Sequence, residues 1–306
     1  MKLVCRKGAG VGSTARGRRY VLAAAVLWSL SGAITKSLSL DPMTIAFYRG
    51  LFAGVALIPF VPRERRVFRP AMLPLGLIFG AMTGLFLGSM KLTTAANTIY
   101  LQYTSTFWVV PLAYVSLGEK PDRRAIVGIG LAIIGIGVIV GFGHSGRSDE
   151  WRGVLMGLAS GLAYSCVVIG MRGFRGLDPI WLSAVNNLGG ALSLGAWMTL
   201  TAGSPVVPSA GQAAILVIFG VVQMAIPYAL FARGLRELDA AEAVLICLVE
   251  PILTPVWVIL VAHEWPRLPT VAGGCLLLAG VVFRYAKFAP RSDDHRVSVN
   301  ERGSRT

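Results

Sequence analysis

The chain has 306 residues, of which 55% are hydrophobic and only 14% are charged, and its formal net charge is +14. Soluble domains carry about 25% charged residues, so this composition excludes an ordinary soluble protein. The apolar residues form runs of about twenty, the length that a helix needs to cross a hydrocarbon core of about 30 Å. The sequence therefore predicts an all-α membrane protein.

Ten transmembrane helices are expected in chain order, at about 20–38, 43–61, 72–90, 94–116, 124–142, 153–171, 179–200, 212–232, 240–262 and 268–286. The span at 94–116 is rich in polar side chains, which usually face the interior of a helix bundle. A basic segment at 1–19 precedes the first span, and a polar tail at 288–306 follows the last.

The basic residues follow the loops between the spans and form no stripe on a soluble face, which argues against a nucleic-acid partner. With the N-terminus inside, Lys91, Arg147, Arg152 and Arg267 are the basic residues of the outer loops. Inner segments hold the rest, apart from Lys36 and Arg49 within spans, as the positive-inside rule requires. We therefore expect a multi-pass protein of the cell membrane with both termini in the cytoplasm.

The chain contains an internal repeat. Residues 95–135 align without a gap on residues 240–280, so that Glu119 matches Glu264 and Gly135 matches Gly280. Earlier parts align at offsets of 136 and 137, where Trp28 matches Tyr164. The first copy is expected at 20–143 and the second at 151–287. Five spans is an odd number, so the copies have opposite orientations, an architecture of many secondary transporters.

These features resemble the EamA-type transporters of the drug/metabolite transporter superfamily. The resemblance rests on the five-span repeat, on the G-E-x-P loop (here GEKP and HEWP) and on a paired G-x-x-L-x-x-x-G pattern; the residues are Gly118 to Pro121, Gly128, Leu131 and Gly135, and His263 to Pro266, Gly273, Leu276 and Gly280. The family also favours the Glu250-Pro251 pair and an arginine at the position of Arg49. The resemblance covers about residues 20–287 and departs at His263, where the first repeat has Gly118. It implies a ten-helix exporter or permease for small metabolites, often amino acids, with a central cavity.

Two charged residues lie deep in expected spans, Arg49 and Glu250. A charge near the bilayer centre costs about 2.5–3.5 kcal/mol on insertion scales, so both are candidates for solute contact, and Glu250 for proton uptake. The alternative is structural: an ion pair or water-bridged network between them, or capping of backbone groups freed by Pro251 and Pro255. Lys36 and Glu242 lie nearer span ends and are expected to reach the membrane interface.

Aromatic and amide side chains complete the expected cavity. Tyr100 and Tyr103 recur at helical spacing, with Gln102 beside them, and such a mixture suits a small amphipathic solute, although it also suits ordinary helix packing. The further candidates are Trp28, Tyr164, Asn186 and Tyr228. Span 3 carries a glycine every fourth residue, at Gly76, Gly80, Gly84 and Gly88, and this stripe predicts a close helix-packing surface.

The function expected is a secondary transporter that exports small organic metabolites, with amino acids or related compounds as the best guess, by alternating access through a central cavity between the repeats. The alternatives are multidrug-type efflux of amphipathic compounds, a passive channel or scaffold, and a membrane-embedded enzyme. An enzyme would need catalytic groups paired at matching depth, and Glu250 is the lone carboxylate deep in a span. No metal or cofactor is expected, because no cysteines have metal-ligand spacing. A lone intramembrane acid permits proton coupling without requiring it.

Overall fold

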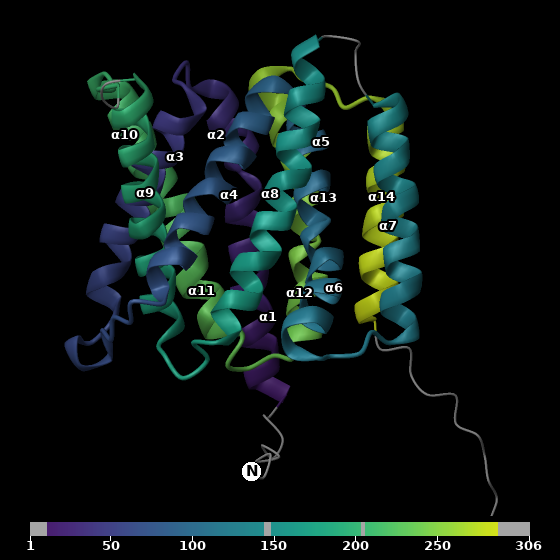
Figure 1. The fold of residues 1–306 in the computed structure, drawn as a ribbon, viewed down its shortest axis with the longest axis horizontal. Helices are drawn as coiled ribbons and strands as arrows, with labels where there is room; N and C mark the ends of the chain where they lie inside the picture. The colour runs from purple at the N-terminus through teal and green to yellow at the C-terminus, as the bar shows by residue number, and fades with distance from the viewer. Residues whose placement is uncertain (1–10, 144–147, 203–205, 287–306) are drawn as a thin grey trace, which may run out of the picture.

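The computed structural model describes residues 11–143, 148–202 and 206–286, and the regular structure of these ranges is entirely helical (Figure 1). The expected tail and the first ten residues lie outside them. The first half contains α1 (Val11–Ser29), α2 (Ser31–Ser37), α3 (Pro42–Leu57), α4 (Met72–Leu92), α5 (Ala95–Tyr103), α6 (Ser105–Leu117) and α7 (Arg123–Phe142), with short 3-10 turns η1 (Ile58–Phe60) and η2 (Arg63–Arg65). The second half contains α8 (Ser148–Arg172), α9 (Pro179–Ala202), α10 (Ala210–Ile218), a π-helix η3 (Phe219–Ala225), α11 (Ile226–Gly234), α12 (Ala240–Cys247), α13 (Val249–Ala262) and α14 (Leu268–Tyr285).

Eight helical segments of the described chain are long and apolar enough to cross a membrane: Ala15–Ser37, Pro42–Phe60, Met72–Leu92, Arg123–Phe142, Asp149–Arg172, Ala210–Gly234, Ala240–Ala262 and Leu268–Tyr285. The expected spans at 94–116 and 179–200 are also helical, as α5 with α6 and as α9, and run beside the others (Figure 1). Large apolar side chains such as Val115, Leu200 and Leu73 are more than half exposed. A chain with this surface requires a lipid environment.

Two helices begin at the same local signal. Asp41 precedes Pro42, and its carboxylate accepts hydrogen bonds from the backbone N–H groups of Met43 and Thr44 at 2.9 and 3.2 Å. Asp178 precedes Pro179 at the start of α9 and accepts from Ile180 N at 2.9 Å. Aspartate accepts from the free amides of a first turn, and proline fits its first position. The Asp-Pro pairs therefore fix the start of α3 and α9.

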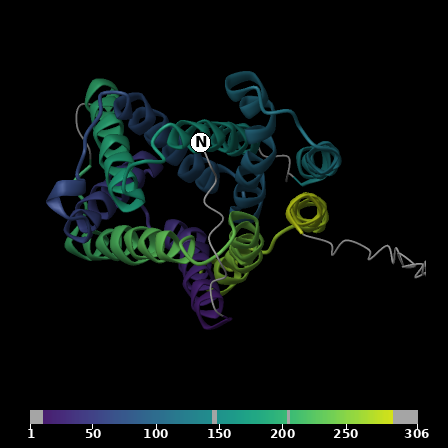
Figure 2. The same ribbon diagram turned by 90° about the horizontal axis from the view of Figure 1, so that it is seen from below.

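The helices α7 and α14 form a pair at one edge of the bundle (Figure 2). A Cβ on Gly135 would lie 2.5 Å from the carbonyl oxygen of Gly273, and a Cβ on Gly273 would lie 2.5 Å from that of Gly135. Gly128 and Gly280 face each other's carbonyl oxygens in the same way, at 3.1 and 2.9 Å. The two backbones are therefore in direct contact at two places, which only glycine permits.

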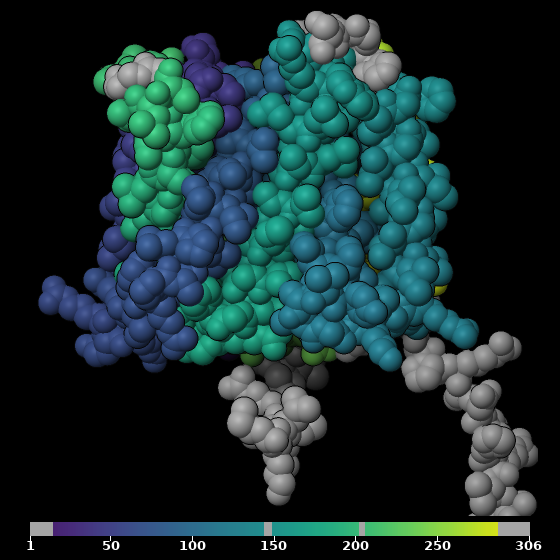
Figure 3. Space-filling view, in the orientation of Figure 1, coloured from purple at the N-terminus to yellow at the C-terminus, as the bar shows by residue number. Residues whose placement is uncertain are grey.

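The glycine stripe of α4 lies against three other helices. A Cβ on Gly76 would meet the backbone of Gly189, and one on Gly80 would meet the backbone of Gly190, so α4 and α9 approach closely there. Gly84 faces Met43 of α3 and Leu194 of α9, and Gly88 faces Met156 of α8. In the view of Figure 3, α9 and α10 form the left part of the surface, α4 and α8 the middle, and α6 and α7 the right.

Candidate functional site

Two interrupted helices meet through Tyr103 and Glu250. Pro251 has no N–H, so the Cys247 carbonyl, four residues earlier, has no helical donor. Tyr103, the last residue of α5, donates its hydroxyl to that carbonyl at 2.8 Å and lies 3.0 Å from Glu250 Oε2. The chain is interrupted at Thr104 between α5 and α6, and at Leu248 between α12 and α13. A carboxyl group and a freed carbonyl are thus held at one phenol between the halves of the chain.

Close packing supports the interruption at Thr104. Thr104 Oγ1 donates to Leu101 O at 2.5 Å, and a Cβ on Gly161 of α8 would lie 2.6 Å from that hydroxyl oxygen. Glycine at position 161 therefore allows α8 to cover the interruption directly.

Two further tyrosines, Tyr164 and Tyr228, lie within electrostatic range of Glu250, and Trp28 contacts Tyr228. The rings of Trp28 and Tyr228 meet edge to face, with centroids 5.5 Å apart. Tyr228 is within electrostatic range of both Arg49 and Glu250, and Tyr164 is within range of Tyr228 and Glu250. Tyr164 keeps 39% of its surface exposed, so the protein covers its side chain only in part. We call Trp28, Arg49, Tyr103, Tyr164, Tyr228 and Glu250 the central cluster.

The guanidinium of Arg49 packs on the ring of Phe219. Its guanidinium carbon is 5.1 Å from the centroid of the Phe219 ring, and the side chain is buried. It makes no ion pair with Glu250, so the direct pair that the sequence suggested is absent. Glu250 is bound to Tyr103 instead, and this leaves the guanidinium free of that carboxylate.

The π-helix η3 positions the partners of Arg49. A Cβ on Gly220 would lie 2.9 Å from the Arg49 carbonyl oxygen and 2.6 Å from Phe52 Cβ, so η3 and α3 touch. One turn later, Gln223 donates its side-chain amide to the Trp28 carbonyl at 2.9 Å. Such π-helical turns in longer helices occur frequently at functional sites. Phe219 was not among the expected site residues, whereas Gln223 interrupts its apolar span visibly and was a candidate together with Tyr228.

Three expected site residues make no hydrogen bond to the central cluster among the described residues. Tyr100 is buried, packs against Gly274 of α14 and borders an open apolar groove of about 840 Å³ between α13 and α14. Asn186 is fully buried in α9 and its Oδ1 has no partner. Gln102 is half-buried and its side chain makes no contact that joins it to the central cluster.

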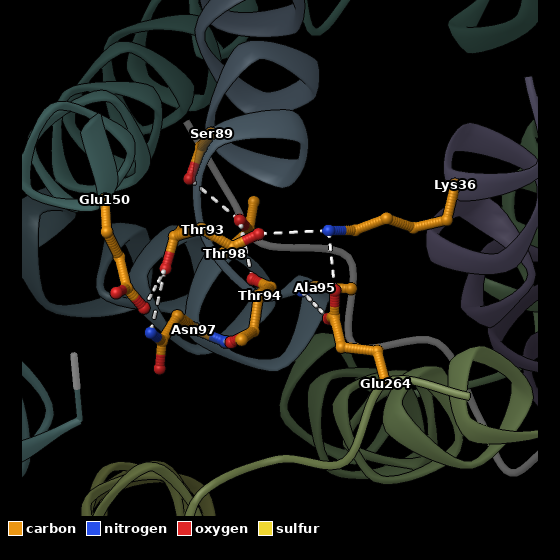
Figure 4. Close-up of polar contacts among 9 residues, drawn as sticks. All are labelled: Lys36, Ser89, Thr93, Thr94, Ala95, Asn97, Thr98, Glu150 and Glu264. Carbon is orange, nitrogen blue, oxygen red and sulfur yellow. Dashed lines mark hydrogen bonds and ion pairs between the residues drawn. The ribbon is translucent and has the colours of Figure 1, made fainter. Parts of the chain in front are cut away.

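A polar network closes the upper end of the bundle in Figure 1, here called the Lys36 end. Lys36 Nζ lies 2.6 Å from Glu264 Oε2 and donates to the Thr93 carbonyl at 3.1 Å (Figure 4). Glu264 also accepts from the backbone N–H of Ala95 at 2.8 Å. Asn97 donates to Thr93 Oγ1 at 3.0 Å. This network joins α2, the start of α5 and the loop between α13 and α14.

The opposite end, here called the Arg172 end, carries a matching ion pair. Arg172 Nη1 donates to Glu119 Oε2 at 2.9 Å. By the offsets of the internal repeat, Arg172 corresponds to Lys36 and Glu119 to Glu264. Side-chain exposure is 30% and 54% for Arg172 and Glu119, against 15% and 24% for Lys36 and Glu264. The Lys36–Glu264 pair is therefore the less exposed of the two.

Two residues expected to reach the membrane interface are paired. Lys36 is held by Glu264, and Glu242 binds Arg18 of α1 at 2.5 Å. A paired partner lowers the cost of placing a charge near the bilayer, and both pairs also tie elements of the bundle together.

Comparison with known proteins defines the class to which this bundle belongs. The model of the EamA-like transporter family matches residues 16–141 and again residues 151–285. The chain therefore belongs to the EamA-like transporter family, and it is a multi-pass membrane transporter.

Individual relatives agree with this family. The chain is 25% identical to an uncharacterized transporter of Archaeoglobus fulgidus over 272 residues, covering 88% of this chain and 96% of the relative. A second uncharacterized transporter of the same organism is 25% identical over 261 residues, covering 81% and 89%. A crystal structure with 18% identity covers 90% of this chain and 98% of its own, with a TM-score of 0.63, which shows a shared fold.

Proposed function

We propose that the protein is a secondary transporter of the cell membrane that exports small organic metabolites, with amino acids or related compounds as substrates. The observation that carries this proposal is the central cluster: an acid, a cation and aromatic rings gather at interrupted helices, and Tyr164 among them is partly exposed. Interrupted helices in membrane proteins are tolerated where they line a cavity. A few polar groups among aromatic rings suit a small amphipathic solute.

The proposed architecture is ten spans in two inverted repeats, at 20–143 and 151–287, with both termini in the cytoplasm. Two separate matches of one family model support the duplication. The contacts of α7 with α14 support it as well, because the offset of 145 converts the Gly128–Gly280 contact into the Gly273–Gly135 contact. The charge asymmetry of the loops supports the orientation.

In the proposed mechanism, the two ion pairs act as alternate closures. Lys36–Glu264 would lie on the outer side and Arg172–Glu119 on the inner side. Inverted repeats that exchange conformations also exchange the state of matching contacts. The lower exposure of the Lys36–Glu264 pair supports an assignment of this structure to a state closed toward the outside.

Tyr103 offers a route for proton coupling. A phenol has one proton to donate, and Tyr103 lies within hydrogen-bond distance of both the Cys247 carbonyl and Glu250. Both contacts are satisfied together when Glu250 carries a proton and donates it to the phenol oxygen. Ionised Glu250 instead competes with the carbonyl for the phenol proton. We propose that this competition couples protonation of Glu250 to the geometry of the interruption at Leu248.

Flux into proteoliposomes tests the proposed function. We expect saturable uptake of at least one radiolabelled amino acid, driven by a pH gradient and lost in Glu250→Gln. Glu242→Gln is the matched control, because Glu242 is an acid of the same span that pairs with Arg18 at its end. Unchanged flux in both Glu250→Gln and Arg49→Ala would exclude the central cluster as the solute site. Uptake of lipophilic cations in place of amino acids would favour multidrug-type efflux.

A further inference from the structure

We infer that Arg49 binds a carboxylate of the solute, so that the central cluster selects compounds carrying a carboxylate at one end and a cationic or hydrogen-bond-donating group at the other. This inference rests on the proposed transport function and names the substrate chemistry that the function leaves open.

The guanidinium of Arg49 has no hydrogen-bonding partner among the described residues. No hydrogen bond or ion pair reaches it, and its Nε is enclosed by protein without an acceptor. The two terminal nitrogens are not enclosed in this way, so they border accessible space. Buried charges in proteins are ordinarily paired, and a guanidinium presents donors in a fork that matches a carboxylate. The protein therefore supplies no anion to Arg49, and a ligand can supply one.

Neighbouring residues hold the guanidinium in place without neutralising it. Phe219 lies beneath it at 5.1 Å, a cation–π contact that orients the group and leaves its hydrogen-bond donors unused. Gly220 brings η3 against the backbone of Arg49, and Gln223 is fixed by its bond to Trp28. Arg49 is thus pre-organised, which lowers the entropy lost when a ligand binds.

Charge in the cluster favours a carboxylate over a phosphate. Arg49 and Glu250 are the charged groups that act on Tyr228 among the described residues, and they have opposite signs. A phosphate dianion would meet one cation and one acid, which leaves it under-compensated. A zwitterion places one negative charge at Arg49 and its positive end toward Glu250. Between the two, the Trp28 and Tyr228 rings provide an apolar wall.

Ligand-induced stabilisation of the full-length protein in nanodiscs provides the first test. The probes are L-phenylalanine and L-leucine, their carboxamides, and the deaminated acids 3-phenylpropionate and 4-methylpentanoate. A ligand that binds the folded state raises the unfolding temperature, and at equal concentration the tighter ligand raises it more. We expect at least one amino acid to stabilise the protein and its carboxamide to bind roughly 30-fold more weakly, the loss expected for one partner of a buried charge pair.

Variants on both sides of the cluster locate the effect. In Arg49→Gln, the acid and the carboxamide should bind equally, whereas Arg49→Lys should retain part of the discrimination. Gly220→Ala, whose methyl group would meet Phe52 and the Arg49 carbonyl oxygen and so push η3 away from α3, should weaken binding of the acid, and Gly211→Ala, with no atom within 4 Å of its Cβ, should not. Equal stabilisation by acid and carboxamide in the wild-type protein, or none by any carboxylate of the panel, would overturn the anion site.

The outcomes also separate this inference from the transport function. If proteoliposomes take up both the amino acids and their carboxamides equally, transport stands and the carboxylate site falls. If carboxylate-dependent stabilisation is found without flux of any probe, the anion site stands and the proposed function falls. The wild-type comparisons need no substitution, so misfolding of a variant cannot decide the question.

Discussion

Gly118 and His263 lie 145 residues apart and end their helices in the same backbone conformation. Gly118 has φ 69° after α6, and His263 has φ 51° after α13. His263 is the one residue other than glycine with positive φ in the described chain. Each precedes the glutamate of an ion pair, Glu119 or Glu264. The left-handed turn directs that glutamate, so the conformation is kept even where glycine has been replaced.

This relationship predicts that His263→Gly stabilises the protein. A left-handed conformation costs a non-glycine residue about 1–2 kcal/mol, and the greater freedom of glycine in the unfolded chain offsets part of the gain. We expect a net gain of about 0.5–1 kcal/mol, measured by denaturant or thermal unfolding in detergent. The reverse change, Gly118→Ala, should cost about 1 kcal/mol for the same reason, although no atom lies within 4 Å of its Cβ. A less stable His263→Gly would show that the imidazole is held by contacts outweighing the strain.

The ion pairs predict opposite effects on the closure of the two ends. Lys36→Met removes the contacts to Glu264 and Thr93 and should favour opening at the Lys36 end, whereas Arg172→Met should favour closure there. A loss of about 1.5 kcal/mol, the low end for hydrogen bonds to charged groups, changes the ratio of the two states about tenfold. The measurement is the labelling rate of Ala95→Cys by an impermeant maleimide, in a background without the native cysteines.

A nearby ion pair serves as the control for this experiment. Arg152 and Asp149 are exposed and pair at 3.3 Å within one helix turn. Such pairs contribute little, so Arg152→Met should leave the labelling rate unchanged. Faster labelling in both Lys36→Met and Arg172→Met would contradict alternate closure and indicate general loosening.

Tyr103→Phe should uncouple transport from the pH gradient. The change removes the donor to the Cys247 carbonyl and the contact with Glu250, and an unsatisfied buried carbonyl costs about 1–3 kcal/mol. Flux driven by a pH gradient should fall at least tenfold. Tyr100→Phe is the matched control, because Tyr100 lies in the same helix and its hydroxyl has no partner among the described residues. Equal losses in the two variants would show that the Tyr103 contacts do not carry the coupling.

The α7–α14 contact predicts a position-specific effect of alanine. Gly135→Ala places a methyl group 2.5 Å from a carbonyl oxygen and should destabilise the protein by about 1–3 kcal/mol, as overpacking does. Gly130→Ala and Gly137→Ala, on the same helix with no atom within 4 Å, should be neutral or stabilising by up to about 1 kcal/mol from helix propensity. Unfolding in mixed micelles measures all three. Similar behaviour of Gly135→Ala and Gly137→Ala would show that the helices do not touch.

Much of the fold was predictable because bilayer thickness fixes the length of each apolar run. The expected helices at 124–142 and 268–286 correspond to α7 at Arg123–Phe142 and α14 at Leu268–Tyr285. No proline next to Thr104 predicts the interruption of the helix there. It depends on Gly161 of another helix, and a local pattern cannot contain that contact. The π-helix was missed for the same reason, because the role of Gly220 is its close contact with α3.

The site was predictable in residue type more than in arrangement. Tyr103 and Glu250 were both expected in the cavity, and they do meet. Tyr100 lies on about the same helical face as Tyr103. Its ring packs on α14, where Gly274 leaves room for it, and not beside Glu250. An ion pair of Arg49 with Glu250 was one of the alternatives, because the two charges lie at similar depths in their spans. In the structure Glu250 is hydrogen-bonded to Tyr103 and not to Arg49. The spacing of residues along the sequence cannot show which of the two binds the acid.

The two glycine contacts between α7 and α14 have a consequence for energetics. The proposed repeat maps this interface onto itself, so its contacts are the same whichever half of the protein adopts which conformation. Its free energy then adds equally to both end states and cancels from the equilibrium between them. The interface can therefore be strong without biasing the direction in which the transporter rests. Substitutions there should change the free energy of unfolding. They should leave unchanged the fraction of time that the protein faces each side of the membrane.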